Sequence, residues 1–291
     1  MGYFSDRHLG RLPRVATEIP EVVSTGIAGL IRIRANDGSF GLDYPEQCPD
    51  GRGPTGTDIN ALRDALAAHR LYNPFGPGIA AAATTMELLD LIEFAHQKIA
   101  GPHSSGHHGF VDHDHLNFDR AEGQTKFRTE INLVFERNGI AFELKDTGRI
   151  ERIAPEGLRE ALSQAVFNTG DNVLDELLER ARTKFLSPNP AIRRESLEAL
   201  WDAWERIKSL ELPADKGEST KRILDKGSGE PNFRQVLEDE ARILTAIGNG
   251  FMIRHAEVGK TPIADDEHVD FLFHRLFALI RLLLKKSNRG G

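Results

Sequence analysis

Histidine is the residue type with which this sequence is best equipped to move protons or to bind a metal ion. The chain has 11 His residues, and five of them fall between positions 103 and 115. Imidazole nitrogens and the carboxylates of nearby Asp residues are ligands for zinc, manganese or iron. One hypothesis is therefore a metal-dependent hydrolase at this segment. The candidate ligands are His107, His113 and His115, with His103 and His108 beside them.

A simpler interpretation of the same segment is a solvated loop with only incidental metal affinity. No Cys lies near these His residues in the sequence, no His-Glu-x-x-His helix is present, and the spacing matches no established zinc motif. Gly101, Gly106 and Gly109 indicate a flexible tract. We favour this interpretation and expect no cofactor and no bound metal.

A second group of candidate residues lies near the C-terminus. Arg254 and His255 stand where a helical pattern stops, and His268 and Arg275 lie seven residues apart on the helix that follows. An Arg–His pair suits phosphodiester chemistry, because His transfers protons near neutral pH and Arg holds phosphate oxygens through two hydrogen bonds. The same residue types also stabilise helix C-termini, so a purely structural role is the alternative.

Composition limits the functional classes that fit. The chain has 44 acidic and 37 basic residues, a net charge of −7, which excludes nucleic-acid binding by bulk charge. The charge is uneven: residues 232–291 carry 9 basic and 8 acidic groups, net +1, which leaves −8 for the rest. A single Cys, no apolar leader and no uninterrupted apolar stretch of about 20 residues predict a cytoplasmic protein without a membrane span.

The elements that must position these residues are mainly helical. Residues 140–144 and 150–153 alternate apolar and polar side chains around a turn, which predicts a small β-hairpin. The Gly/Pro-rich segment 37–58 and the His-rich segment are expected to be irregular, and 211–231 a loop with one short helix. Composition changes near residue 154, so we expect a mixed domain over 1–154 and an all-helical domain over 155–291. Helical spacing is found at about 19–36, 59–71, 85–99, 122–138, 155–167, 171–186, 190–209, 232–255 and 265–286.

The last two helical patterns carry further information. The apolar face of 265–286 is too wide for a helix half in water, so we expect another domain or a second subunit to cover it. Gly248 and Gly250 inside the preceding helix indicate either a close backbone approach or fraying.

Four segments of the sequence resemble the bacterial AbiJ-type abortive-infection proteins. They are Met1-Gly2-Tyr3-Phe4-Ser5-Asp6-Arg7, the stretch from Glu130-Ile131-Asn132 through Asn138-Gly139 to Leu144, Ile253-Arg254-His255-Ala256-Glu257, and 268–277. In such proteins an accessory N-terminal domain precedes a C-terminal HEPN domain.

The resemblance implies an all-helical HEPN bundle, usually dimeric, which in many relatives is a metal-independent endoribonuclease. The HEPN motif is Arg, a polar residue, then His four to six intervening residues after the Arg. Arg254-His255 matches its first half. The positions where the His is expected are occupied by Gly259, Lys260 and Thr261. His255 or His268 would then act as the base, and a catalytically silent module that dimerises or senses is the alternative. We accordingly expect a homodimer through the C-terminal helices and RNA as a partner; the sequence names no trigger and no antitoxin.

Overall fold

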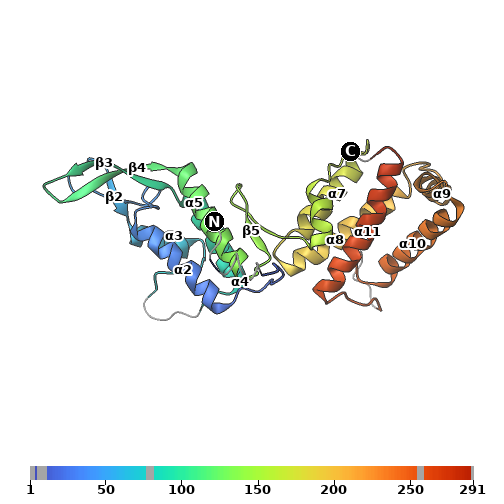
Figure 1. Ribbon diagram of the computed structural model, residues 1–291, viewed down its shortest axis with the longest axis horizontal. Helices are drawn as coiled ribbons and strands as arrows, with labels where there is room; N and C mark the ends of the chain where they lie inside the picture. The colour runs from blue at the N-terminus through green and yellow to red at the C-terminus, as the bar shows by residue number, and fades with distance from the viewer. Residues whose placement is uncertain (1–3, 5–11, 77–81, 254–258, 290–291) are drawn as a thin grey trace. The chain divides into compact units, whose positions relative to one another are not determined.

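A computed structural model describes Phe4 and residues 12–76, 82–253 and 259–289 of the chain (Figure 1). The chain divides into two compact units, residues 1–153 and 154–291. The described residues form ten helices and three two-stranded antiparallel sheets. The predicted mainly helical class is therefore confirmed, although one hairpin was expected and three are present.

Four helices build the hydrophobic core of the N-terminal unit. They are α2 (Glu21–Asn36), α3 (Ile59–Ala68), α4 (Thr85–Lys98) and α5 (Arg120–Arg137). Their buried faces meet in one cluster that includes Ile27, Leu88, Ile92, Phe127 and Ile131. Helix α4 starts with a capping box, in which Thr84 accepts a hydrogen bond from the backbone of Glu87 and the Glu87 carboxylate accepts one from the backbone of Thr84.

Each small sheet joins two strands that are consecutive in the chain. They are β1 (Pro45–Gln47) with β2 (Pro54–Thr57), β3 (Gly101–His108) with β4 (His113–Asp119), and β5 (Phe142–Leu144) with β6 (Ile150–Arg152). The third pair confirms the predicted hairpin. The prediction of an irregular His-rich loop is wrong, because residues 101–119 pair as a long hairpin, and segment 37–58 contains the β1–β2 pair.

The C-terminal unit is an all-helical bundle. It contains α6 (Glu156–Ser163), α7 (Asn172–Phe185), α8 (Pro190–Ile207), α9 (Lys216–Gly227), α10 (Pro231–Gly250) and α11 (Asp266–Lys286). Asn189 caps α8, and Pro190 occupies its first turn, where the missing N–H of proline costs no helical hydrogen bond. The segment expected to be mostly loop forms the three-turn helix α9, which buries Ile223 and Leu224.

The apolar face of α11 is covered mainly inside its own unit. Leu276, Ile280 and Leu283 are among nine buried side chains of this helix, and α8 and α9 pack against it. A second subunit is therefore not needed to bury them, whereas Phe271 remains exposed. No helix in the described part of the chain is long and apolar enough to span a membrane.

At Gly248 in α10 the structure shows the close backbone approach, the first of the two alternatives that the sequence left open. A Cβ at this position would lie 2.2 Å from Cδ1 of Trp201, which is buried in the core of the bundle. The indole nitrogen of Trp201 donates a hydrogen bond to the carbonyl of Leu244 on the same helix, at 3.0 Å. Gly250 has open space around it, so only one of the two glycines is required by packing.

Candidate metal centre

One candidate ligand comes from the turn between β1 and β2. Cys48 follows β1 directly, its backbone nitrogen donates to the carbonyl of Gly53 at 3.0 Å, and its own carbonyl accepts from Gly51 at 2.9 Å. Gly51 has a φ of 71°, a left-handed conformation that glycine adopts without strain. The turn places the thiol inward, and Cys48 is only 3% exposed.

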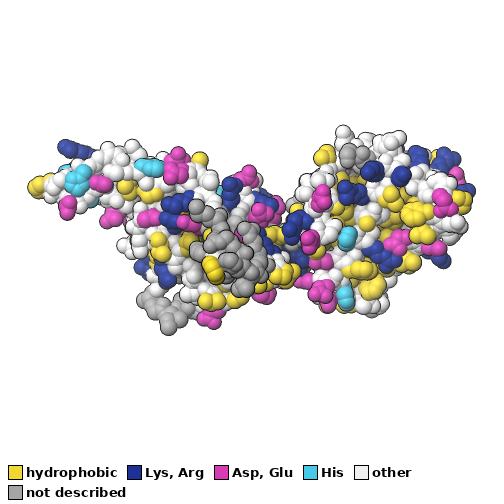
Figure 2. Space-filling view, in the orientation of Figure 1, with side chains coloured by type: hydrophobic (Ala, Val, Ile, Leu, Met, Phe, Trp, Pro, Cys, Tyr) yellow, Lys and Arg dark blue, Asp and Glu magenta, His cyan; other side chains and the backbone are white. Residues whose placement is uncertain are grey.

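The β3–β4 hairpin supplies three imidazoles on one face. His108 is the cross-strand partner of His113 in the antiparallel register. Side chains alternate between the two faces of a strand, so His115, two residues after His113, lies on the same face. Figure 2 shows His side chains gathered over this hairpin, at the left of the view.

These four side chains, which we call the Cys48 cluster, are arranged compactly. The ring centroids of His108, His113 and His115 form a nearly equilateral triangle with sides of 5.5, 5.4 and 5.5 Å. The Sγ atom of Cys48 lies 3.1 Å from Nε2 of His113 and 3.5 Å from Nδ1 of His108. One ligand atom from each residue lies within 4.8 Å of all the others.

Packing at the base of the hairpin brings the two elements together. The backbone at Gly41 lies so close to β2 and β4 that a Cβ there would be 2.4 Å from the carbonyl oxygen of Gly56 and 2.8 Å from the ring of Phe118. Gly38, at a φ of 88°, lies against Leu116 in the same way. The segment that carries Cys48 is thus held against β4 by close contacts at positions where only glycine fits.

Asp50 provides a negative charge beside the cluster. Its carboxylate lies 3.1 Å from Nδ1 of His108 and 3.9 Å from Nε2 of His115. A hydrogen bond from the Cys48 thiol lowers the pKa of Asp50, and burial raises the pKa of that thiol. Nε2 of His115 is buried and makes no hydrogen bond with the described residues.

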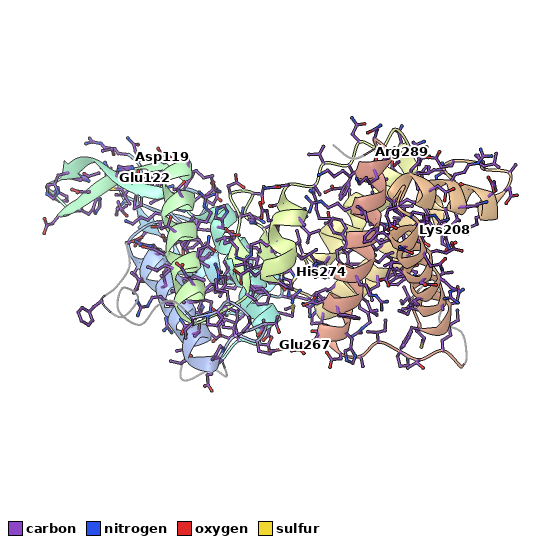
Figure 3. All side chains as sticks on the ribbon, turned by 45° about the vertical axis from the view of Figure 1, so that its right-hand side comes forward. Asp119, Glu122, Lys208, Glu267, His274 and Arg289 are labelled. Atoms are coloured by element: carbon purple, nitrogen blue, oxygen red, sulfur yellow. The ribbon has the colours of Figure 1, made fainter. Side chains whose placement is uncertain are left out.

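The structure brings His113 and His115 together but does not bring His107 to them. His107 pairs with Asp114 across the strands and therefore lies on the other face, where its Nδ1 is 2.9 Å from the Asp114 carboxylate. His108 takes its place in the cluster. His103 lies near the other end of the hairpin, 2.8 Å from the carboxylate of Glu122 in α5, which is labelled in Figure 3. No Cys lies near these His residues in the sequence, but the fold brings Cys48 to them from 60 residues before His108.

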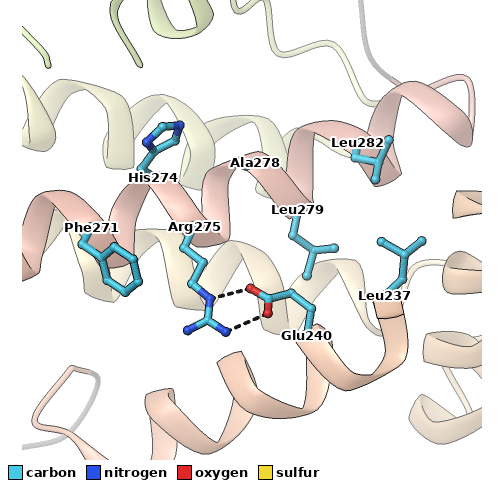
Figure 4. Close-up of a pocket in the computed structure, with 8 residues that line it drawn as sticks. All are labelled: Leu237, Glu240, Phe271, His274, Arg275, Ala278, Leu279 and Leu282. Atoms are coloured by element: carbon cyan, nitrogen blue, oxygen red, sulfur yellow. Dashed lines mark hydrogen bonds and ion pairs between the residues drawn. The ribbon is translucent and has the colours of Figure 1, made fainter. Parts of the chain in front are cut away.

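The second group of predicted site residues is only partly visible. Arg254 and His255 lie outside the described residues. His268 is exposed in the first turn of α11, where Asp265 caps the helix. Arg275 does not join it: its guanidinium forms a bidentate ion pair with Glu240 of α10, at 2.6 and 2.7 Å (Figure 4).

Comparison with known proteins assigns the N-terminal part of the chain. Residues 2–168, more than half of the sequence, match the family model of AbiJ N-terminal domain 4. The match extends through α6 and leaves the remainder of the helical bundle unassigned. No curated protein and no solved structure matches the chain. The AbiJ family implies a role in abortive infection, a form of anti-phage defence. The chain belongs to the AbiJ N-terminal domain 4 family.

Proposed function

We propose that this protein acts in anti-phage defence by cleaving RNA through a HEPN-like C-terminal unit. The observation that carries the proposal is the combination of an AbiJ N-terminal domain with an Arg–His pair between the last two helices of an all-helical bundle. Arg254 and His255 are the only adjacent Arg–His pair, Arg first, in the C-terminal unit. They stand in the positions that the first half of the HEPN motif requires.

The ends of the connection that holds this pair are tied to each other. Helix α10 ends at Gly250, and the backbone nitrogen of Met252 donates to the carbonyl of Thr261 at 2.9 Å. Phe251 and Thr261 form an isolated bridge. His268 follows seven residues later as an exposed side chain. The described residues on either side of the pair are thus joined, and an exposed imidazole follows seven residues after Thr261.

The proposed chemistry needs no metal ion. A histidine, His255 or His268, takes the proton of an RNA 2′-hydroxyl, and the 2′-oxygen forms a bond to the adjacent phosphorus while the bond from phosphorus to the 5′-oxygen breaks. The leaving 5′-oxygen receives a proton from an acid or from water. Arg254 stabilises the charge that develops on the phosphoryl oxygens. The products are a 2′,3′-cyclic phosphate and a 5′-hydroxyl.

The test compares RNA in phage-infected cells that express wild-type protein, Arg254→Ala or Arg281→Ala. Arg281 is an exposed arginine of α11, so its removal changes the net charge equally and serves as the matched control. We expect infection-dependent RNA fragments ending in cyclic phosphate with wild type and Arg281→Ala. Arg254→Ala should lose cleavage by at least about 100-fold, the typical contribution of a charge-stabilising donor. Equal cleavage, or none with any protein during phage arrest, contradicts the proposal.

A second candidate function, a catalytically silent dimerisation or sensor module, is favoured by a surface groove between α10 and α11. The groove is lined by Leu237, Phe271, Leu279 and Leu282, with the Arg275–Glu240 ion pair in its wall (Figure 4). Phe271 is 59% exposed. An exposed apolar strip of this kind suits the expected homodimer through the C-terminal helices.

Light scattering distinguishes this candidate. Phe271→Glu should convert a dimer to a monomer, whereas Phe110→Glu, which alters a 94% exposed Phe of the N-terminal unit, should leave the dimer intact. A wild-type monomer at micromolar concentration would exclude the dimerisation module. A dimer together with intact RNA in the infection experiment would favour it over the nuclease.

A further inference from the structure

We propose that the Cys48 cluster binds one zinc ion, which fastens the β3–β4 hairpin to the turn between β1 and β2. The site is confined to the N-terminal unit and does not depend on the proposed RNA cleavage. Its role is structural, because four protein ligands complete a tetrahedral shell and leave no open position for a substrate or a reactive water.

The distances fit a zinc tetrahedron. Zinc lies at about 2.3 Å from thiolate sulfur and about 2.0–2.1 Å from imidazole nitrogen, so neighbouring ligand atoms are separated by about 3.3–3.6 Å. The Cys48 Sγ atom is 3.1 Å from the ligand nitrogen of His113 and 3.5 Å from that of His108. Two edges of the tetrahedron are thus close to their final length, and the remaining ligand atoms lie within 4.8 Å.

A bound cation would explain why three imidazoles and a thiol lie so close together. Three imidazoles face one another at ring separations of 5.4–5.5 Å, and among the described residues Nε2 of His115 is buried without a hydrogen bond. A central zinc ion would give that nitrogen a partner and would bind the buried sulfur together with the other two imidazoles. With the Cys48 thiolate and the Asp50 carboxylate, the formal charge of the site sums to zero.

The hairpin itself needs such a cross-link. No side chain of β3 or β4, both fully described, belongs to the hydrophobic core cluster. An isolated two-stranded hairpin is at best marginally stable in water. Zinc sites supply folding free energy directly, so a metal ion at the far end of the hairpin compensates for the missing core there.

Elemental analysis of protein purified without chelators tests the proposal. Wild type should contain one zinc ion per chain, and Cys48→Ser and His113→Ala should lose zinc affinity by more than about 100-fold. His107→Ala removes an imidazole from the opposite face of the same hairpin and should keep the metal. Circular dichroism verifies that the helices of each variant are intact.

Cobalt gives an independent readout on the wild-type chain, which needs no variant to fold. Replacement of zinc by Co²⁺ should produce a thiolate-to-metal charge-transfer band and the intense visible bands of tetrahedral cobalt. Zinc-free wild type that also shows no tetrahedral cobalt spectrum overturns the proposal. Cys48→Ser with full zinc content overturns the closed four-ligand site and points instead to a three-His centre with an open position, as a hydrolase requires.

Discussion

The His-rich hairpin and the C-terminal bundle are held in place by different kinds of interaction. In the bundle, α11 alone buries nine residues in a core that also includes Trp201 and Trp204. The hairpin contributes no side chain to a hydrophobic core, and packing at its base and polar contacts such as those of His108 and His113 with Cys48 hold it to the rest of its unit. Apolar burial therefore accounts for the position of the bundle helices, whereas the far end of the hairpin depends on the Cys48 cluster.

This contrast also separates the chemistry of the two regions. The hairpin concentrates imidazoles and carboxylates on a small exposed element, and the β1–β2 turn adds the thiol of Cys48, so a metal ion can bind these groups together. The bundle places its proposed Arg–His pair in a connection between two well-packed helices. A stable scaffold with a polar connection suits catalysis, and a polar hairpin with one buried thiol suits a structural metal site.

Metal removal should have the largest effect, and it should be confined to the hairpin. Hydrogen exchange after chelation should show that amide protection across residues 103–116 falls by about 100-fold or more, because a ligand at 100 times its Kd stabilises by about 2.7 kcal/mol. Protection of α8 and α11 should not change, because the bundle contains none of the four ligands. An equal loss of protection in the hairpin and in the bundle would contradict the claim that only the hairpin depends on the metal.

Gly248→Ala should have the next largest effect, on the bundle. The new Cβ would meet Trp201 at 2.2 Å, so the free energy of unfolding should fall by about 2 kcal/mol. Gly250→Ala is the matched control, because nothing lies within 4 Å of its Cβ, and it should stabilise the helix by up to about 1 kcal/mol.

Urea unfolding followed by Trp fluorescence measures this pair of variants. Both Trp residues of the chain lie in the bundle core, so the signal reports on this unit alone. A Gly248→Ala protein as stable as wild type would show that the Trp201 contact is not tightly packed.

The smallest predicted effect is a pH dependence that belongs to the N-terminal unit. Burial lowers the pKa of His96 below its ordinary value of 6.5, and Arg128 adds to the shift. The unfolded chain then binds the proton more readily, so this contribution to stability is fully present above pH 6.5 and is lost as the pH falls towards the folded-state pKa. Each pKa unit of difference corresponds to about 1.4 kcal/mol.

Hydrogen exchange of α4 and α5, corrected for the intrinsic pH dependence of exchange, follows this loss between pH 7 and pH 5. His96→Gln should flatten the dependence in these helices. An unchanged slope in the variant would assign the acid sensitivity to other groups.

The fold was predictable where apolar side chains follow a period. Phe142, Leu144 and Ile150 alternate with polar residues and gave the β5–β6 hairpin, and the apolar stripe of α11 gave a helix with nearly correct ends. The β3–β4 hairpin was not predicted from the sequence. Its first strand contains no Val, Ile, Thr, Phe, Tyr or Trp and no apolar alternation over Gly101-Pro102-His103-Ser104-Ser105-Gly106. Helix α9 was not predicted at its full length, because most of its surface is polar and glycines stand near both of its ends.

The candidate metal site was predictable only in part. His113 and His115 follow the two-residue period of a strand, and the same period excludes His107 and selects His108 once the register is known. The sequence held this signal, but it could be used only after the segment was recognised as a hairpin. Cys48 could not be found from spacing, since its approach depends on the close contacts of Gly38 and Gly41 with β4.

X-ray absorption at the zinc edge of the purified protein tests the central claim most directly, because it reports the atoms bound to the metal. The Cys48 cluster predicts one sulfur at about 2.3 Å and three imidazole nitrogens at about 2.0–2.1 Å. A shell of oxygen and nitrogen without sulfur, or the absence of zinc, would contradict the account.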